Sequence, residues 1–325
     1  YTGTANYRDG AGTEAENAAG GGHAHCGTMI YLGDNWPDKY RNTLFTNNIH
    51  GKRINNDILR RSGSGYLASH GSDTMRSRDP WFVGVTLQYG PDGSVFVIDW
   101  SDTGECHSVR NTQRHTGRIY RIAYGTPNRP VLNLANSTNE RLVDLQQHRN
   151  DWFVRHARRI LQERAAAGTN MDSSAASLRS IFDTASDETK RLRAFWALHV
   201  IGGLDEATLL NDLDDDSEHV RTWAIQLLVE NRRVGSEKSP LVTDDLSQSA
   251  ALSPRAVQRL IELAAADPSP LVRLFLASAL QRLSHQSRWA IAEALAAHAE
   301  DNSDANIPLM VWYGVEPLIL DDPSE

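Results

Sequence analysis

Two histidines and a cysteine lie within four positions near the start of the chain, at His23, His25 and Cys26. The second of the two cysteines, Cys106, is followed directly by His107. Imidazole and thiolate groups suit a tetrahedral zinc or copper centre, and a disulfide between the two cysteines is the alternative. The candidate ligands of such a centre are His25, Cys26, Cys106 and His107. Two cysteines alone leave the compartment of the protein open.

Three carboxylates fall within seven positions at Asp99, Asp102 and Glu105. Carboxylate oxygens beside the backbone carbonyls of a turn are the hard ligands that calcium prefers, so we expect a calcium site at these residues. The alternative is that Asp99 and Asp102 accept hydrogen bonds from nearby turn amides and bind no ion.

A third polar stretch, Asn47-Asn48-Ile49-His50, precedes Gly51. Amide side chains both donate and accept hydrogen bonds, and histidine is the usual proton acceptor near neutral pH. These residues could therefore contact a polar ligand. The alternative is that the asparagines satisfy loop amides and that His50 only belongs to a tight turn.

The first 126 residues predict antiparallel strands, because short apolar runs alternate with turn residues such as Pro91-Asp92-Gly93. They predict one complete four-stranded unit and most of a second, and repeated units of this length are typical of the blades of a β-propeller. Two blades cannot close a ring, so we expect further blades before residue 1. The expected strands cover residues 23–33, 42–49, 51–59, 65–72, 81–90, 94–102 and 117–125.

Antiparallel strands bring the start of one strand and the next hairpin to the same end of a blade. The three polar stretches, residues 23–26, 47–50 and 99–107, should therefore lie on one face, where propellers usually carry their functional residues. We expect a ligand site there. Its expected lining residues, besides His25 and His50, are His23, Asn47, Asn48, Asp99, Trp100, Asp102 and His107.

The second half of the chain predicts helices, since from residue 140 the apolar spacing changes to three and four. Residues 127–139 read as a linker, and 140–325 as the helical domain. A short motif recurs around Arg155, Arg193, Arg221 and Arg273. Paired helices that bury their apolar stripes on neighbouring pairs form an α-solenoid, and this motif resembles that of HEAT repeats. An unrelated helical bundle is the alternative.

The net charge and composition argue against some classes of binding partner. The formal net charge of −8 over 325 residues argues against nucleic acid or an anionic membrane surface. No apolar run approaches the roughly 20 residues that cross a bilayer. The first ten residues contain no signal-peptide pattern and no initiator Met, so the chain reads as a piece of a larger protein.

The N-terminal motifs resemble those of the sorbosone dehydrogenase-like and soluble quinoprotein glucose dehydrogenase-like propellers. The segments GGHAHCG, GDNWPDKYR, NNIHGKRIN and DWSDTGECH, together with the helical repeats, resemble large secreted planctomycetal proteins named as membrane-bound dehydrogenases or haem-binding proteins. In those proteins a propeller is followed by HEAT repeats and a c-type cytochrome. The matching positions are residues 30–33, 36–37, 40–41, 44–45, 50–51, 91–93 and 117–122.

The resemblance implies a fragment of an exported sugar or alcohol dehydrogenase, secreted or periplasmic, that passes electrons to a cytochrome. The relatives use calcium and pyrroloquinoline quinone, and their catalytic histidine lies in an earlier blade, so His25 and His50 are the expected bases here. The resemblance also favours the disulfide between Cys26 and Cys106, because the two cysteines would lie at the same end of neighbouring blades of an exported protein.

The chain departs from this family in two places. No Cys-x-x-Cys-His motif occurs, so we expect no c-type haem on this chain. Phe82 and Val83 follow Trp81 where the relatives carry an Arg-Pro pair, which weakens the case for the quinone. A non-catalytic propeller and solenoid that bind a polysaccharide or a protein, with the solenoid facing a partner or the cytochrome, is therefore the alternative function.

Overall fold

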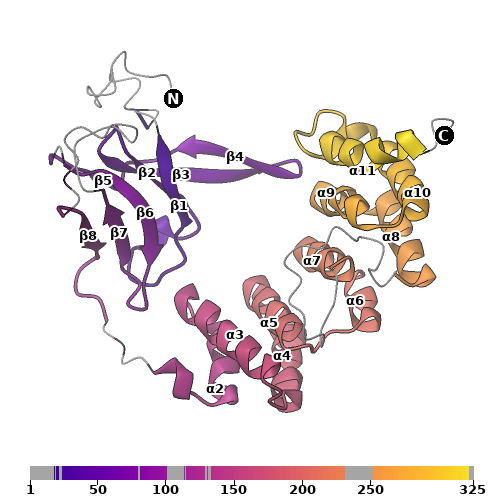
Figure 1. Ribbon diagram of the computed structural model, residues 1–325, viewed down its shortest axis with the longest axis horizontal. Helices are drawn as coiled ribbons and strands as arrows, with labels where there is room; N and C mark the ends of the chain where they lie inside the picture. The colour runs from indigo at the N-terminus through magenta and orange to yellow at the C-terminus, as the bar shows by residue number, and fades with distance from the viewer. Residues whose placement is uncertain are drawn as a thin grey trace. The chain divides into compact units, whose positions relative to one another are not determined.

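The computed structural model contains antiparallel strands followed by helices, which agrees with the expected β-then-α order (Figure 1). It describes residues 18, 20–21, 24–79, 81–100, 113, 115–128, 130, 133–230 and 252–321. Within these residues no helix is both long and apolar enough to cross a membrane.

The chain divides into two compact units. Unit one comprises residues 1–60 and 67–160, and unit two comprises residues 61–66 and 161–325. The packing boundary therefore lies inside the helix α3 (Asp151–Ala166) rather than in the expected linker at 127–139. The reason is that the start of α3 is bonded to the strand region: the Asp151 N–H donates to the Leu32 carbonyl at 3.0 Å.

Unit one contains two antiparallel sheets. In sheet one the strand order is β1-β2-β3-β4, and a short fifth strand pairs with the start of β3. Sheet two has the order β6-β7-β8, with its strands side by side in Figure 1. The strands are β1 (His25–Ile30), β2 (Leu44–Asn48), β3 (Arg53–Ser62), β4 (Gly65–His70), β5 (Met75–Arg76), β6 (Gly84–Tyr89), β7 (Val95–Asp99) and β8 (Arg118–Ile122).

The seven expected strands correspond to β1–β4 and β6–β8, and β5 was not expected. The core of unit one includes Tyr31, Phe45 and Ile54 from sheet one and Val95 and Val97 from sheet two, all fully buried. Side chains alternate between the two faces of a strand. Thr46, Asn48, Arg53, Asn55 and Asp57 therefore belong to the opposite, polar face of sheet one.

The helices of unit one are short or partial. They are α2 (Asn139–Asp144) and α3 up to Ile160. Asn150, just before α3, is fully buried and donates to the Asp34 carboxylate and the Gly90 carbonyl, both at 3.0 Å. These bonds hold the start of the helix against the two loops.

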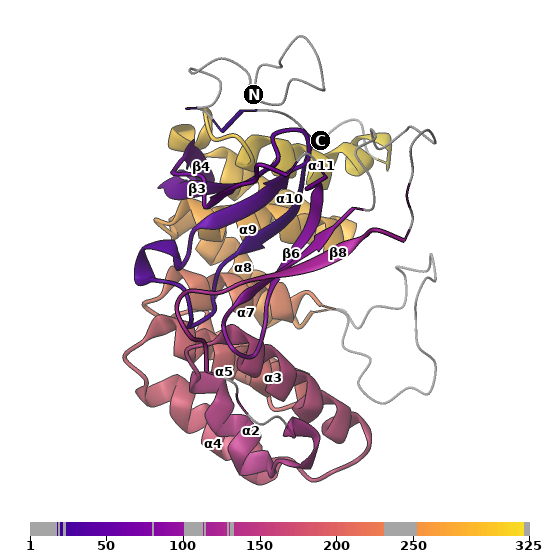
Figure 2. The same ribbon diagram turned by 90° about the vertical axis from the view of Figure 1, so that its left-hand side faces the viewer.

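Unit two is helical. Several of its helices begin at an Asp or Ser that accepts a hydrogen bond from the first turn, which marks their N-termini, as at Ser217 and Ser269. Helices α8, α9 and α10 pack on one another (Figure 2). The helices are α4 (Asp172–Thr184), α5 (Glu188–Val200), α6 (Glu206–Asp212), α7 (Glu218–Leu228), α8 (Pro254–Ala266), α9 (Pro270–Ala279), α10 (His285–Ala296) and α11 (Ile307–Asp321).

A series of Arg–Asp pairs runs through unit two. Arg191 of α5 pairs with Asp215, Arg221 of α7 with Asp267, and Arg273 of α9 with Asp301. In each pair an arginine near the start of one helix bonds an aspartate before a later helix. We call these three pairs the Arg–Asp series.

The recurring arginines were only partly identified from the sequence. Arg221 and Arg273 belong to the series, but in α5 the position is taken by Arg191 and not Arg193. Arg193 is buried, and Arg155 pairs with Asp151 of its own helix. In α5 the sequence motif therefore indicated Arg193, which lies about half a helical turn after the arginine that forms the pair.

Candidate functional site

The described members of the expected ligand site lie at one end of the two sheets. His25 begins β1 and is opposite Asn48, the last residue of β2. In sheet two, Gly84 begins β6 and is opposite Asp99, the last residue of β7. His50 is in the turn between β2 and β3. We call this end of the two sheets, where His25, Asn48, Gly84 and Asp99 lie, the His25 end.

The first strands of the two sheets, β1 and β6, contact each other at the His25 end. The Cys26 thiol donates to the Gly84 carbonyl at 3.6 Å. A Cβ atom at Gly84 would lie 2.5 Å from the Asn47 Oδ1, and one at Gly27, where φ is +61°, would lie 2.6 Å from the Val85 carbonyl oxygen. The absence of side chains at both glycines is therefore what allows this close approach.

Asn47 is the least satisfied polar residue of the His25 end. Its side chain is fully buried, and neither its Nδ2 nor its Oδ1 has a hydrogen-bond partner. A buried amide without partners destabilises a fold by about 1–3 kcal/mol. In the described part of sheet one, Thr46 Oγ1 and Asn55 Oδ1 on the opposite face, and Thr74 Oγ1 before β5, also lack a partner.

The polar face of sheet one carries a network of charged groups beside these atoms. Arg53 Nη1 lies 3.0 Å from Asp73 Oδ2, with both side chains almost completely buried. His70 Nδ1 lies 3.2 Å from Asp57 Oδ1, and its Nε2 lies 3.5 Å from Asp73 Oδ1. An imidazole held between two carboxylates is oriented to exchange protons.

Backbone oxygens already occupy part of this face. The Nδ2 of Asn55 donates to the Gly20 carbonyl at 2.7 Å, and the Nδ2 of Asn48 donates to the carbonyls of Gly20 and Gly21. The side-chain amides of Asn48 and Asn55 are therefore hydrogen-bond donors on this face.

Asp99 has a structural environment that was not expected. Its Oδ1 accepts from the Val83 N–H at 2.6 Å, and its Oδ2 accepts from Arg118 Nε at 2.7 Å. Both oxygens thus join the ends of β6, β7 and β8. The described residues contain no group of three or more His, Cys, Asp or Glu residues that could hold a metal ion.

Several expected site residues lie outside the described part of the chain. They are His23, Asp102, Glu105, Cys106 and His107. The calcium site, the His/Cys centre and the disulfide therefore stay predictions. Trp100, at the end of β7, is described and is 48% exposed.

Cys26 is half-buried, and this burial raises the pKa of its thiol. The thiol form therefore predominates at neutral pH, and a thiolate ligand or nucleophile would need a compensating positive charge.

His70, Asp57 and Asp73 were not among the site residues expected from the sequence. A signal was present, since Arg53, Asn55 and Asp57 repeat polar residues with a period of two inside a predicted strand. That pattern indicates a second, polar face of the sheet. The pairing of β5 with β3, which brings Asp73 to Arg53, had no comparable signal.

Comparison with known proteins gives a family without an assigned activity. Residues 4–126, less than half of the chain, match a domain of unknown function, DUF7133. No curated protein matches the chain.

Proposed function

We propose that the two sheets bind a small sugar or alcohol at the His25 end, and that the chain is part of an exported protein that oxidises such a compound. The observation that carries this proposal is the buried Asn47 amide, which has no partner for either of its polar atoms. Polar atoms that destabilise the fold are typical of sites selected for binding rather than for stability.

The chemistry of these groups supports a polyhydroxylated ligand. Asn47 offers a donor and an acceptor side by side. A sugar hydroxyl also donates and accepts, so neighbouring hydroxyls can satisfy an amide in the way that a second amide would. The exposed ring of Trp100 supplies an apolar surface of the kind that binds the C–H face of a sugar.

His25 and His50 are the proposed proton acceptors. Oxidation of an alcohol removes a hydroxyl proton and a hydride, and an imidazole suits the first task. The hydride needs a separate acceptor. Asp99 already accepts hydrogen bonds from Val83 and Arg118, and residues 81–83 offer no basic group to a quinone. Recognition and proton acceptance are therefore the steps proposed for this chain.

The proposed architecture places the two sheets as neighbouring blades of a β-propeller and the helices as HEAT-like repeats. The contact of β1 with β6 supports the first part, since the innermost strands of neighbouring blades meet around a propeller axis. The Arg–Asp series supports the second part, because a repeated bond between successive units is expected of a solenoid.

A non-catalytic carbohydrate-binding module is the second candidate. The engagement of Asp99 by Val83 and Arg118 favours it, since that carboxylate then has a structural role. Both the dehydrogenase and the binding module require binding of the carbohydrate, and only the dehydrogenase also oxidises it.

Isothermal titration of the full chain with hexoses and hexitols tests the binding step. We expect His25→Ala and His50→Ala to weaken binding by about tenfold or more while the melting temperature changes little. His219→Ala, on α7 in unit two, is the control and should bind like the wild type. Equal binding by all three variants would contradict the proposal, as would a loss that only follows the unfolded fraction.

Oxidation of the bound compound with a soluble electron-accepting dye separates the two candidates. Turnover that is lost in His25→Ala or His50→Ala supports the dehydrogenase, and binding without turnover supports the module.

A further inference from the structure

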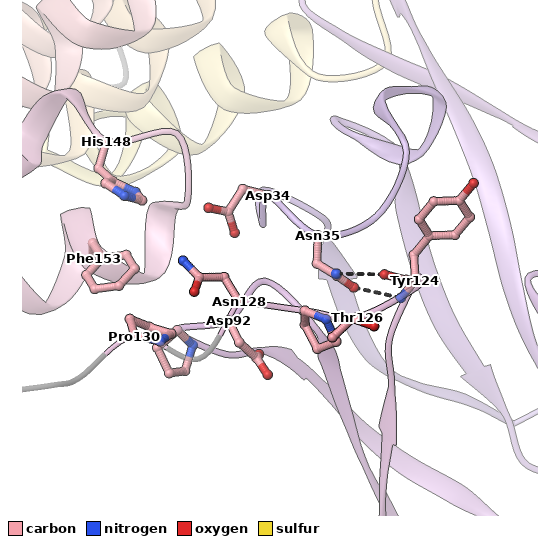
Figure 3. Close-up of a pocket in the computed structure, with 11 residues that line it drawn as sticks. Asp34, Asn35, Asp92, Tyr124, Thr126, Asn128, Pro130, His148 and Phe153 are labelled. Atoms are coloured by element: carbon pink, nitrogen blue, oxygen red, sulfur yellow. Dashed lines mark hydrogen bonds between the residues drawn. The ribbon is translucent and has the colours of Figure 1, made fainter.

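The opposite end of unit one contains a cavity of about 380 Å³ (Figure 3). Four segments far apart in the sequence line it: the loop after β1, the β6–β7 hairpin, the segment after β8 and the start of the helical region. The lining residues are Asp34, Asn35, Pro91, Asp92, Tyr124, Thr126, Pro127, Asn128, Pro130, His148 and Phe153. We call this cavity the Asp34 pocket, and we propose that it binds one unit of a neutral sugar.

The size of the Asp34 pocket suits one sugar ring. Binding sites for small molecules generally have volumes of roughly 300–1,000 Å³, so this cavity is at the lower end of the range. A single hexose unit is compatible with it, whereas a dinucleotide is not.

The walls of the pocket are held in place by bonds that do not involve a ligand. The Asn35 side chain pairs with the backbone of Tyr124, donating to its carbonyl at 3.0 Å and accepting from its N–H at 2.7 Å (Figure 3). The Asn150 amide donates to Asp34 Oδ1 and to the Gly90 carbonyl. A preorganised site of this kind binds without first ordering its loops.

The polar groups around the pocket include both donors and acceptors. Asn128 and Thr126 are exposed and neutral, and the Asp34 carboxylate also borders the space. His148 Nδ1 lies 3.0 Å from the backbone nitrogen and 3.3 Å from the carbonyl oxygen of Asn150. Mixed neutral donors and acceptors match the hydroxyls of a sugar.

Apolar surfaces complete the match. Phe153 lies across the pocket beside His148, with ring centroids 4.5 Å apart, whereas the Tyr124 ring points away from the pocket (Figure 3). Flat rings next to hydrogen-bonding groups pack against the C–H faces of a pyranose ring while its hydroxyls are bonded at the edges.

The charge of the lining favours a neutral ligand. The described lining contains two carboxylates, Asp34 and Asp92. Asp92 is paired with Arg121, whereas Asp34 accepts a hydrogen bond from the neutral Asn150 amide and keeps its charge. One such carboxylate among the described residues disfavours an anionic ligand and attracts a polyamine only weakly.

The test uses the full chain and saturation-transfer NMR, with methyl glucoside, methyl galactoside, glucuronate and spermidine as probes. We expect a neutral glycoside to bind and the anion and the polyamine not to bind. Thr126→Val and Asn128→Ala should weaken this binding about tenfold. Both changes leave the backbone bonds of the pocket in place. Thr169→Val, which removes an exposed hydroxyl in unit two, is the matched control and should bind normally.

The proposal is overturned if no neutral glycoside binds, if glucuronate or spermidine binds more tightly, or if both pocket variants bind like the control. Asn47→Leu distinguishes the two sites. Binding in the Asp34 pocket should survive this change, whereas binding at the His25 end should not.

Discussion

The hydroxyl of Tyr31 donates a hydrogen bond to the carbonyl oxygen of Gly93 at 2.7 Å, although the two residues are 62 positions apart. The Tyr31 hydroxyl oxygen itself accepts from the N–H groups of Asn35 at 3.0 Å and Trp36 at 2.8 Å. One buried hydroxyl therefore joins the loop after β1 to the β6–β7 hairpin, beside the Asp34 pocket.

Tyr31→Phe removes all three of these bonds and keeps the ring. We expect it to reduce the free energy of unfolding by about 2–3 kcal/mol, because the Trp36 N–H and the Gly93 carbonyl lose a partner in a buried setting. Urea denaturation measures this change. A loss below about 0.5 kcal/mol would mean that water replaces the hydroxyl.

The pH dependence of stability offers a second test of Tyr31. Burial raises the pKa of its hydroxyl, so the folded protein holds this proton to a higher pH than the unfolded chain does. Stability from this group is therefore present below the ordinary pKa of tyrosine and falls as the pH rises above it. The fall should be smaller in Tyr31→Phe than in the wild type, and an identical fall in both proteins would contradict this account.

Burial also controls the reactivity of Cys26. Because burial raises the pKa of its thiol, the reduced protein should react slowly with iodoacetamide at neutral pH and faster only above the ordinary pKa of a thiol. Peptide mapping by mass spectrometry measures the rate at this residue. Rapid modification at pH 7 would show that the thiol is exposed or activated.

The same mapping tests the proposed disulfide with Cys106. Without reductant, the protein should take up no thiol-reactive tag at either cysteine, and both should react after reduction and unfolding. Tagging of Cys26 in the unreduced, unfolded protein would exclude the disulfide.

The Arg273–Asp301 pair tests the Arg–Asp series of unit two. The side chains are only 4% and 8% exposed, and Asp301 accepts two hydrogen bonds of 2.6 Å from the guanidinium group. Asp301→Ala should destabilise the protein by about 3–5 kcal/mol because it leaves a buried charge without its partner. Thermal denaturation measures this effect.

An exposed pair provides the control for that variant. Arg259 and Glu262 are 30% and 45% exposed, so Glu262→Ala should leave the melting temperature almost unchanged. The double variant Arg273→Met with Asp301→Leu should recover most of the stability lost in Asp301→Ala. If Asp301→Ala is as mild as Glu262→Ala, the series does not hold the helices together.

The sequence predicted the strands and the helical half well, because both depend on local patterns. Alternating residues such as Val95 and Val97 indicate a strand with one buried face, and the structure buries both completely. The spacing of apolar residues by three and four, and the serines at 217 and 269 that begin helices, are local patterns of the same kind.

The candidate sites were harder to predict, because they depend on contacts between distant segments. Asp99 was expected to bind an ion, but strand pairing places Arg118 directly opposite it and uses its carboxylate. The lining of the Asp34 pocket comes from four separate segments, and no residue of it was expected to belong to a site. Among the described residues, His25, Asn47, Asn48, His50 and Asp99 were expected at one end of the sheets and lie there.

The Asn47→Leu variant tests the central claim most directly, because leucine has a similar size and no unmet hydrogen bonds. If Asn47 is retained for a ligand, the variant should be more stable than the wild type by about 1–3 kcal/mol and should lose binding of hexoses and hexitols at the His25 end. Parallel urea denaturation and isothermal titration of the two proteins measure both quantities. A variant that is less stable than the wild type, or one that binds these compounds unchanged, would contradict the claim.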